Sequence, residues 1–406
     1  MNSLQKIVGI TIIGLIYFTN YSFAQSYILR GKVLDDTTGE PIEFATVYIN
    51  KTTNGTVTDS EGEFELTFTQ GQPELVVSFA GYHPIVHLLD VTTLDQEYTF
   101  KMAADTKILN DVEVRSTRDS IWYLNLEVFK REFIGRTTFG TQCELINIVD
   151  LIIDYSPKTN IMEVRAKNAL TINNYGLGYQ IQYLLNHFKY DLNNGYLTFA
   201  GYTYFAPLEG NKRKLKKWNK NRLKAYNGSS MHFLRALRKR QLEEEQFNLR
   251  RLIREPNPER PSDEKIKAAR WAYRNTRDSL TQTALDSITD ILARARKPRI
   301  LEYLDTAKVA YENYLIESGE VSELKFDGYF QVVYIGEKEE PSYVRSRSLF
   351  RQREPTFQTS IISLTVESDK INPSGSMQDP YSLVYEGYWS WEKLGDMLPL
   401  NYTIGQ

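Results

Sequence analysis

The stretch from Gly31 to Tyr82 constrains the fold most, because apolar and polar residues alternate along it between closely spaced turn residues. Leu29, Gly31 and Val33 share one face of a predicted strand, and the same period of two recurs in four later segments. Such a period, with one apolar face, is typical of strands that cover a core on one side only. Short strands separated by turns therefore predict a small antiparallel β-sandwich over residues 25–104.

Turn residues divide this predicted sandwich. Asp59-Ser60-Glu61-Gly62 fits a type I turn, with Asp at the first position and Gly at the last. A second turn is expected at Asp35–Gly39, before Pro41, and Gly81 marks a further break. The spacing of these turns leaves room only for short strands.

Four spaced blocks in this stretch also carry a family resemblance. The blocks are Gly31-x-Val33-x-Asp35, Pro41-Ile42-x-x-Ala45-x-Val47, Gly55-Thr56-x-Thr58-Asp59-x-x-Gly62-x-Phe64 and Val77-Ser78-Phe79-x-Gly81-Tyr82. In this order they resemble the carboxypeptidase-regulatory-like domain, a β-sandwich of the prealbumin (transthyretin-like) type found at the N-termini of many exported and outer-membrane proteins of Bacteroidetes. The resemblance covers about a fifth of the chain. It implies a structural or docking module and no peptidase activity.

The first 24 residues have the pattern of a secretory signal peptide. Lys6 is the only charge before the apolar run Ile7–Phe18, and the small residues Ser22 and Ala24 follow it. The run is shorter than the ~20 residues that cross a bilayer, so an uncleaved anchor is the less favoured alternative. We therefore expect an exported protein, located in the periplasm or associated with the outer membrane.

Net charge and cysteine content argue against some kinds of function. A net charge of -2 argues against a nucleic-acid binder, so no nucleic-acid partner is expected. Cys143 is the only cysteine, which excludes an internal disulfide. Because cysteine usually partitions into protein interiors, we expect Cys143 to be a small buried apolar residue rather than a reactive thiol.

A linker is expected over residues 105–118. Its segment Thr106–Ser116 resembles the stretch that follows the same sandwich in Bacteroidetes TonB-dependent receptors, where a plug and a large barrel come next. The remainder of this chain is too short for that barrel and contains a charged helical block. The sequence therefore predicts a different second domain over residues 119–406.

That second domain is expected to be a larger, β-rich α+β domain with a helical insertion at residues 212–297. A short helix is expected at 119–133, and an inserted helical hairpin is expected from Met231–Arg254 and Ser262–Arg296. The whole chain is thus predicted to be mainly β with α. The expected strands are Leu145–Tyr155, Asn160–Ala166, Leu177–Tyr190, Tyr196–Phe205, Leu324–Ile335, Phe357–Glu367 and Ser382–Trp389, with a hairpin turn at Asn193-Asn194-Gly195.

Two segments of this domain also resemble the uncharacterised second half of Bacteroidetes exported proteins that carry the same sandwich. They are His232–Leu237, which reads HFLRAL, and Gly387–Pro399, which reads GYWSWEKLGDMLP. No activity is assigned to that family, so the resemblance implies no reaction and no site residue.

Two groups of side chains are candidates for surface binding. Aromatic residues near the C-terminus could stack on sugar rings or on a partner, and core packing is their alternative. A basic run could contact anionic lipid heads, and a solvated helix start is its alternative. The candidates are Tyr388, Trp389, Trp391, Lys214, Lys216 and Lys217.

No motif predicts a reaction. The chain has no G-x-S-x-G elbow, no glycine-rich phosphate loop and no zinc-ligand spacing. His83 and His87 are four residues apart on a predicted strand, about 13 Å at ~3.3 Å per residue, which is too far to share one zinc ion. We therefore predict no catalytic residue, no cofactor and no metal site.

The sequence favours a non-enzymatic docking, binding or structural role in the cell envelope. The expected partner is an envelope protein or glycan, with a peripheral outer-membrane contact as a further candidate. The alternative is an accessory-domain-bearing hydrolase of envelope glycans or peptides, because a glycosidase needs only two carboxylates and the chain has 51 acids.

Overall fold

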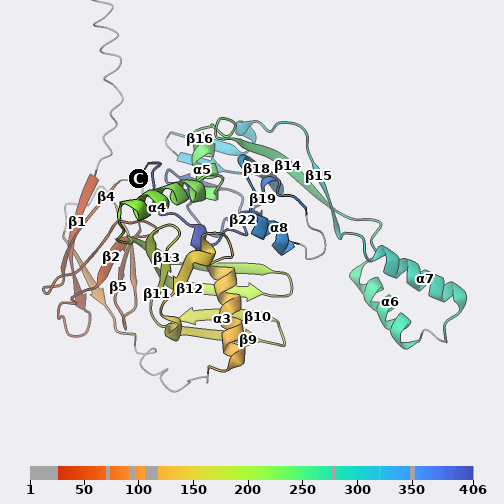
Figure 1. The fold of residues 1–406 in the computed structure, drawn as a ribbon, viewed down its shortest axis with the longest axis horizontal. Coiled ribbons are helices and arrows are strands. Elements are labelled where there is room, and N and C mark those ends of the chain that lie inside the picture. The colour runs from red at the N-terminus through yellow and green to blue at the C-terminus, as the bar shows by residue number, and fades with distance from the viewer. Residues whose placement is uncertain are drawn as a thin grey trace, which may run out of the picture. The chain divides into compact units, whose positions relative to one another are not determined.

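A computed structural model describes residues 26–69, 74–90, 97–105, 118–276, 279–319, 321–347 and 353–405 (Figure 1). The signal peptide predicted at 1–24 and residues 106–117 of the predicted linker lie outside the described residues. Contacts within the chain define two compact units. Unit 1 contains the described residues up to Phe129, Glu144–Gly210 and Pro399–Thr403, and unit 2 contains Lys130–Cys143, Asn211–Leu398 and the last described residues.

The first part of unit 1 is the predicted β-sandwich, which the structure confirms. One sheet has the order β4-β1-β7 and the other β3-β2-β5-β6. The core between them is built from the alternating apolar residues, among them Leu29, Val47 and Leu75, which are fully buried. The strands are β1 (Ser26–Asp35), β2 (Thr46–Ile49), β3 (Gly55–Val57), β4 (Glu63–Thr69), β5 (Glu74–Ser78), β6 (Ile85–Leu88) and β7 (Tyr98–Met102).

The expected turn at Asp59–Gly62 is present, and one strand pairing differs from the prediction. The Asp59 carboxylate accepts the backbone N–H groups of Glu61 and Glu63, and Gly62 has φ +72°. However, β7 pairs with β1 in parallel, so the sandwich is not wholly antiparallel. The paired residues of β1 and β7 are about seventy positions apart along the chain. Such a distant pairing is set by packing and not by the local sequence pattern.

A six-stranded sheet forms the rest of unit 1. Its order is β8-β11-β12-β10-β9, with β13 paired to β12 through a long antiparallel ribbon. The hairpin turn expected at 193–195 closes this ribbon, with Gly195 at φ +71°. The elements are α3 (Ser120–Phe133), β8 (Cys143–Leu145), β9 (Leu151–Ser156), β10 (Ile161–Ala166), β11 (Leu170–Asn174), β12 (Tyr179–Asp191) and β13 (Tyr196–Pro207).

The strand expected over 145–155 is divided in two. β8 ends at Leu145, and a 3-10 helix, η3 (Ile148–Asp150), precedes β9. Asn147 explains the break, because its side chain donates to Asp150 and accepts the backbone N–H of Thr171 at 2.8 Å. An Asn side chain that bonds nearby backbone offers the chain an alternative to the strand ladder.

The turn after β2 joins the sandwich to β13 within unit 1. Lys51 donates its backbone N–H to Thr203 at 2.6 Å, and Phe205 donates to Thr52 at 3.0 Å. The Asn50 side chain accepts the backbone N–H of Thr203 at 2.9 Å. These contacts fix one side of the sandwich against the ribbon.

Unit 2 contains two further sheets. A five-stranded sheet has the order β15-β14-β18-β19-β22, and a four-stranded sheet has the order β16-β17-β20-β21. Their strands are β14 (Phe247–Pro256), β15 (Ile300–Leu304), β16 (Leu315–Ser318), β17 (Val321–Leu324), β18 (Tyr329–Lys338), β19 (Phe357–Leu364), β20 (Asp369–Asn372), β21 (Ser376–Met377) and β22 (Leu383–Gly387). The helices of unit 2, besides the end of α3, are α4 (Lys212–Tyr226), α5 (Ser230–Arg238), α6 (Asp263–Asn275), α7 (Gln282–Arg294), α8 (Pro341–Arg347) and the 3-10 helices η2 (Gly140–Gln142), η5 (Tyr311–Asn313) and η6 (Leu394–Asp396).

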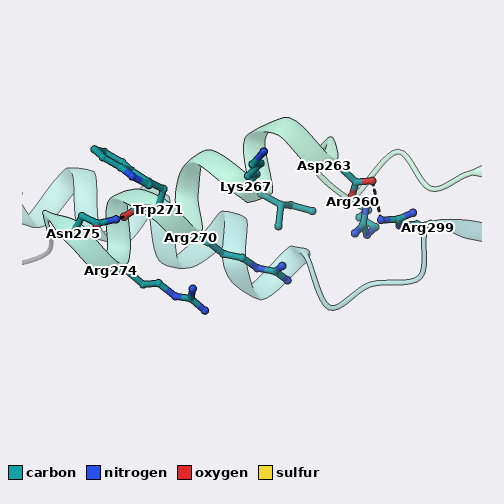
Figure 2. A pocket seen from close by; sticks show the side chains of 9 residues that line it. Arg260, Asp263, Lys267, Arg270, Trp271, Arg274, Asn275 and Arg299 are labelled. Carbon is teal, nitrogen blue, oxygen red and sulfur yellow. Dashed lines mark hydrogen bonds and ion pairs between the residues drawn. The ribbon is translucent and has the colours of Figure 1, made fainter. Parts of the chain in front are cut away.

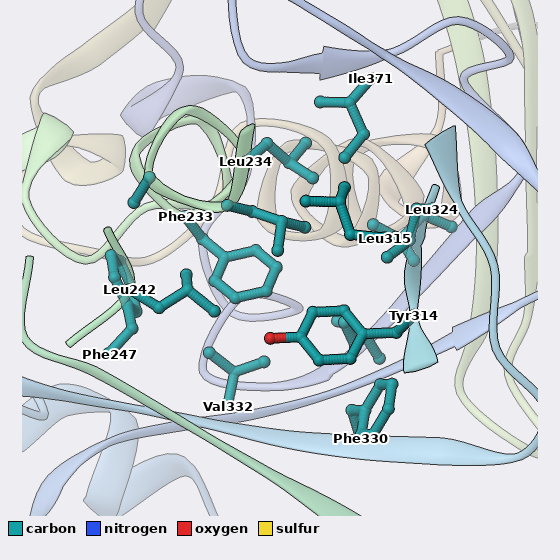
Figure 3. Close-up of a cluster of buried hydrophobic side chains, with 14 of the residues drawn as sticks. Phe233, Leu234, Leu242, Phe247, Tyr314, Leu315, Leu324, Phe330, Val332 and Ile371 are labelled. Carbon is teal, nitrogen blue, oxygen red and sulfur yellow. The ribbon is translucent and has the colours of Figure 1, made fainter. Parts of the chain in front are cut away.

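The core of unit 2 lies around α5 (Figure 3). Phe233 extends from this helix toward Phe247 of β14 and Val332 of β18, whereas Leu234 lies nearer Ile371, and all of these residues are buried. The aromatic rings of Phe233 and Phe247 meet edge to face, with centroids 5.5 Å apart. This packing explains why the segment beginning at His232 is a helix with a strongly apolar face.

The predicted helical insertion is partly wrong. The helix expected over 231–254 ends at Arg238, and residues 247–256 form β14, a strand paired with both β15 and β18. Arg240 and Gln246 have positive φ angles, which reverse the chain between helix and strand.

The helix expected over 262–296 is two helices, α6 and α7. They pack together, so a helical hairpin is inserted between β14 and β15, but both of its helices come from the predicted second helix and not from the two predicted arms. Ser262 and Thr281 cap their N-termini, each accepting a backbone N–H three residues later. None of the helices in the described part of the chain is both long enough and apolar enough to span a membrane.

Candidate binding sites

A groove of about 650 Å³ lies along α6 in the helical hairpin (Figure 2). We call it the α6 groove. Its lining combines one bulky aromatic side chain, five cationic side chains and a single carboxylate. The lining residues are Arg260, Asp263, Ile266, Lys267, Arg270, Trp271, Arg274, Asn275 and Arg299.

Helical spacing places the cations of the α6 groove on one face. Lys267, Arg270 and Arg274 are three and four residues apart, so they lie above one another along the helix. Ile266, which also lines the groove, and Ala269 are the buried residues of this helix. The hairpin therefore needs α6 to be amphipathic, and its solvent face is the one that carries the positive charge.

The single carboxylate of the groove is already engaged. Asp263 accepts a hydrogen bond from Arg260 at 2.9 Å and forms an ion pair with Arg299 at 2.8 Å. The hydrogen bond from Arg260 is the main reason that the pKa of Asp263 lies below its usual value. The charge of Asp263 is thus largely neutralised at the end of the groove where α6 begins.

Trp271 is exposed in the α6 groove, with 63% of its surface accessible. Its neighbour one turn later, Asn275, donates its side-chain amide to the Trp271 carbonyl at 2.8 Å. A large aromatic ring left in water beside cations is a feature of binding surfaces rather than of a folded core.

A second cavity, of about 590 Å³, lies in unit 1 between the start of α3 and the β9–β10 hairpin. Asp119 caps α3 by accepting the N–H of Trp122 at 2.8 Å. Ile121 and Leu124 of the same helix are exposed. The acids at this cavity have partners, since Asp154 pairs with Arg165 and Glu163 pairs with Lys189.

Acidic side chains also gather around η6 in unit 2. Burial raises the pKa of Glu392 well above its usual value, and repulsion from Asp396, Glu340 and Glu337 adds to the shift. Burial likewise raises the pKa of Asp396, although the Thr137 hydroxyl donates to its carboxylate at 2.8 Å. Neither Glu392 nor Asp396 lines the two cavities described above.

The aromatic candidates for surface binding are placed mostly in the interior. Tyr388 and Trp389 are buried, and the Trp389 indole donates its N–H to the Gly228 carbonyl at 2.7 Å. Trp391 is partly buried against Tyr343, and the Arg136 guanidinium lies 5.0 Å from its ring centre. Core packing, the alternative that the sequence left open, therefore accounts for Tyr388 and Trp389.

The basic candidates are placed on α4. Lys214, Lys216 and Lys217 are exposed, while Trp218 of the same helix is buried. Asn211 caps the helix by accepting the N–H of Lys214 at 3.0 Å. The structure thus shows a regular helix with a solvated basic face and does not join these lysines to the aromatic candidates in one site.

The remaining singled-out residues form no metal site among the described residues, where no group of three or more potential ligands occurs. His83 faces Asp105 at 3.4 Å, whereas His87 packs against the Phe100 ring, so the two histidines have separate surroundings. Cys143 is partly buried, and burial raises the pKa of its thiol to about 12. A thiol with this pKa is almost wholly protonated at neutral pH and is a poor nucleophile.

The α6 groove was missed from the sequence, although a signal for it exists. Lys267, Arg270, Trp271 and Arg274 follow i, i+3, i+4 and i+7 spacing within a predicted helix, which places them on one face. That face could have been identified as polar and aromatic. The sequence did not show that α7 would leave it uncovered.

Comparison with known proteins confirms the resemblance in the N-terminal part. Residues 29–114 match the model of the CarboxypepD_reg-like domain family. Over 113 residues, 28% of the chain, the sequence is 36% identical to the TonB-dependent receptor SusC of Bacteroides thetaiotaomicron. The chain spans only 10% of the length of that receptor.

Two of the solved structures that align with this chain do so with low TM-scores. A putative membrane-associated protein of unknown function from Bacteroides fragilis aligns over 89% of this chain and 93% of its own, with 11% identity and a TM-score of 0.15. A 9R-lipoxygenase from Cyanothece PCC8801 aligns over 53% of this chain and 49% of its own, with 10% identity and a TM-score of 0.13. Neither score indicates a common architecture.

Proposed function

From the premise that residues 29–114 form a CarboxypepD_reg-like domain, we propose that the chain is an exported, non-enzymatic protein of the cell envelope. Its setting is the periplasm or the outer membrane. The observation that carries the proposal is the 36% identity of this region to part of a TonB-dependent receptor. The apolar run and small-residue cleavage pattern of residues 1–24 support export.

The sandwich supplies a docking surface in this proposal. One of its sides is fixed to β13, and β6 forms the end strand of the sheet β3-β2-β5-β6. Leu88 of β6 is 69% exposed, and Val86 is also exposed. An end strand with exposed apolar side chains can pair with an extended segment of a partner protein through ladder hydrogen bonds along its outer edge.

Localisation and neighbour capture test this proposal. The full chain, expressed in its native host, is fractionated, shaved with protease and crosslinked in intact cells. We expect a mature form without residues 1–24 in the envelope fraction, crosslinked through the sandwich to an envelope protein or glycan-bearing component. Recovery of the uncleaved chain in the cytosol would refute the proposal.

A hydrolase of envelope glycans or peptides remains the second candidate, and the acids around η6 favour it. A carboxyl group with a raised pKa can act as a general acid, as Glu392 could. The test is turnover of envelope polymers by the purified chain and its Glu392→Gln and Asp396→Asn variants. If the purified chain turns over an envelope polymer, and each substitution alone abolishes that turnover while the fold is retained, the protein is a hydrolase and not a non-enzymatic binding protein.

A further inference from the structure

We propose that the α6 groove binds an acidic sugar, whose carboxylate or phosphate group contacts the cations while its ring stacks on Trp271. The inference deepens the proposed function by naming a class of ligand, and it depends on that function only for the extracytoplasmic setting. It is carried by the geometry and charge of the groove, described above.

Charge identifies the anionic part of the ligand. The lining cations outnumber the single carboxylate, and that carboxylate is engaged by Arg260 and Arg299. Lys267, Arg270 and Arg274 have no ion pair with any residue in the described part of the chain, although Arg270 lies near enough to Asp263 to lower its pKa. These three cations repel one another at helical spacing, and a bound anion would relieve that repulsion.

Arginine favours a planar or tetrahedral anion. Its guanidinium offers paired donors that match the two oxygens of a carboxylate or phosphate, and Arg270 and Arg274 are one helical turn apart. Figure 2 shows both side chains extending from the same side of α6. Two such forks along one face suit acidic groups that repeat along an oligosaccharide.

Trp271 identifies the sugar ring. Its indole is exposed, and Lys267 precedes it by one turn while Asn275 follows by one. Sugar rings place C–H groups on one face and hydroxyl groups at the rim, so an indole can cover the face while polar neighbours bond the rim. The Asn275 amide group donates to the Trp271 carbonyl, which leaves the amide oxygen as an acceptor for a hydroxyl.

The concave shape favours a sugar over a membrane surface. A volume of about 650 Å³ falls in the range of ligand pockets. A helix that lies in a bilayer interface needs a broad apolar face. Trp271 is the one large apolar side chain exposed on α6 or α7, which are both described in full.

Calorimetric titration of the full chain tests the inference. The probes are hexagalacturonic acid, a phosphorylated disaccharide of the lipid A type, and neutral maltohexaose. We expect at least one acidic probe to bind, with affinity that falls as salt rises, and the neutral probe to bind at least about tenfold more weakly. Arg270→Ala, Arg274→Ala and Trp271→Ala should each weaken acidic-sugar binding about tenfold.

Lys265→Ala is the matched control, since Lys265 is an exposed cation of α6 outside the groove lining. It should bind the acidic probe as the wild type does, and circular dichroism should show that all four variants keep their helix content. Equal loss of affinity in Lys265→Ala would overturn the inference, because net charge alone would then explain the binding.

Three further results would overturn it. The first is equal affinity for the acidic and neutral sugars, and the second is no binding of either acidic probe. The third is binding to phosphatidylglycerol vesicles that depends on Trp271 and Arg274 and that neither acidic sugar displaces. If the phosphorylated disaccharide displaces the protein from lipid A vesicles, the acidic sugar that the groove binds can be part of a lipid. None of these results depends on where the protein is located in the cell.

Discussion

At the residue scale, Trp389 is held by both packing and a hydrogen bond. Its ring contacts Phe233 and Tyr385, and its indole N–H is donated to the buried Gly228 carbonyl. Trp389→Phe keeps an aromatic ring but leaves that carbonyl without its donor. We expect the free energy of unfolding to fall by about 1–3 kcal/mol.

Urea denaturation measures this loss, and Trp271→Phe is its control. The same chemical change at the exposed Trp271 should alter the unfolding free energy by no more than about 0.5 kcal/mol. If both substitutions had the same small effect, Trp389 would not be a core residue, and its surface-binding interpretation would regain support.

The raised pKa of Glu392 should make the free energy of unfolding depend on pH. Its pKa in the folded chain is raised by burial and by neighbouring carboxylates, whereas an unfolded chain ionises near the ordinary value of 4.5. As pH rises through that ordinary value the unfolded chain loses the proton that the folded chain keeps. Unfolding is therefore favoured, and stability falls until the raised pKa is passed.

Glu392→Gln should remove part of this dependence. We expect the variant to gain on the order of 1 kcal/mol of unfolding free energy at pH 8 and little at pH 4, because the glutamine cannot ionise. Chemical denaturation at a series of pH values gives the comparison, with Glu255→Gln as an exposed control on β14. A gain that is equal at both pH values would contradict the assigned cause.

At the element scale, the turn between β2 and β3 joins the sandwich to β13. Gly55 makes this possible, because a Cβ added there would lie 2.5 Å from Cε2 of Tyr204. The Tyr204 ring also packs on Tyr48, with centroids 5.3 Å apart. Asn401 completes the junction by accepting the Thr53 backbone N–H and donating to its hydroxyl.

Gly55→Ala should therefore weaken unit 1 through steric conflict. We expect a loss of about 1–3 kcal/mol in the unfolding free energy, as for other overpacked sites. Tyr204→Leu makes room, so in a double-mutant cycle the two substitutions together should cost less than the sum of their separate costs. Strict additivity, measured by denaturation, would show that Gly55 and Tyr204 are not in contact.

Local pattern predicted most elements, and its failures have physical causes. The strands at β10, β12 and β13 alternate clearly, and α3 has clear helical spacing, so both kinds were predicted near their observed bounds. Residues 247–254 were predicted to be the end of a helix that begins at Met231. The segment becomes a strand because β15 and β18 pair with it on both sides, which the local sequence does not show.

The candidate sites were harder to predict than the elements. A helix near α6 was predicted, but which of its faces stays uncovered depends on how α7 packs against it, which the local sequence does not show. Tyr388 and Trp389, in contrast, were candidates for an exposed surface and are buried. Composition alone could not distinguish an exposed aromatic surface from a core, and the core of unit 2 buries them.

At the scale of the whole molecule, two parts are proposed to bind partners. The proposed docking module is the CarboxypepD_reg-like domain, and the proposed ligand site is the charged groove with an exposed indole in the helical hairpin of unit 2. Neither role requires a reaction. We propose that the protein contributes binding surfaces to the envelope.

Protease shaving of intact cells, followed by mass spectrometry of the mature N-terminus, tests the central claim most directly. We predict an envelope-bound protein that begins near Gln25 and is crosslinked to an envelope component through residues 29–114. A cytosolic protein that keeps residues 1–24 would contradict it.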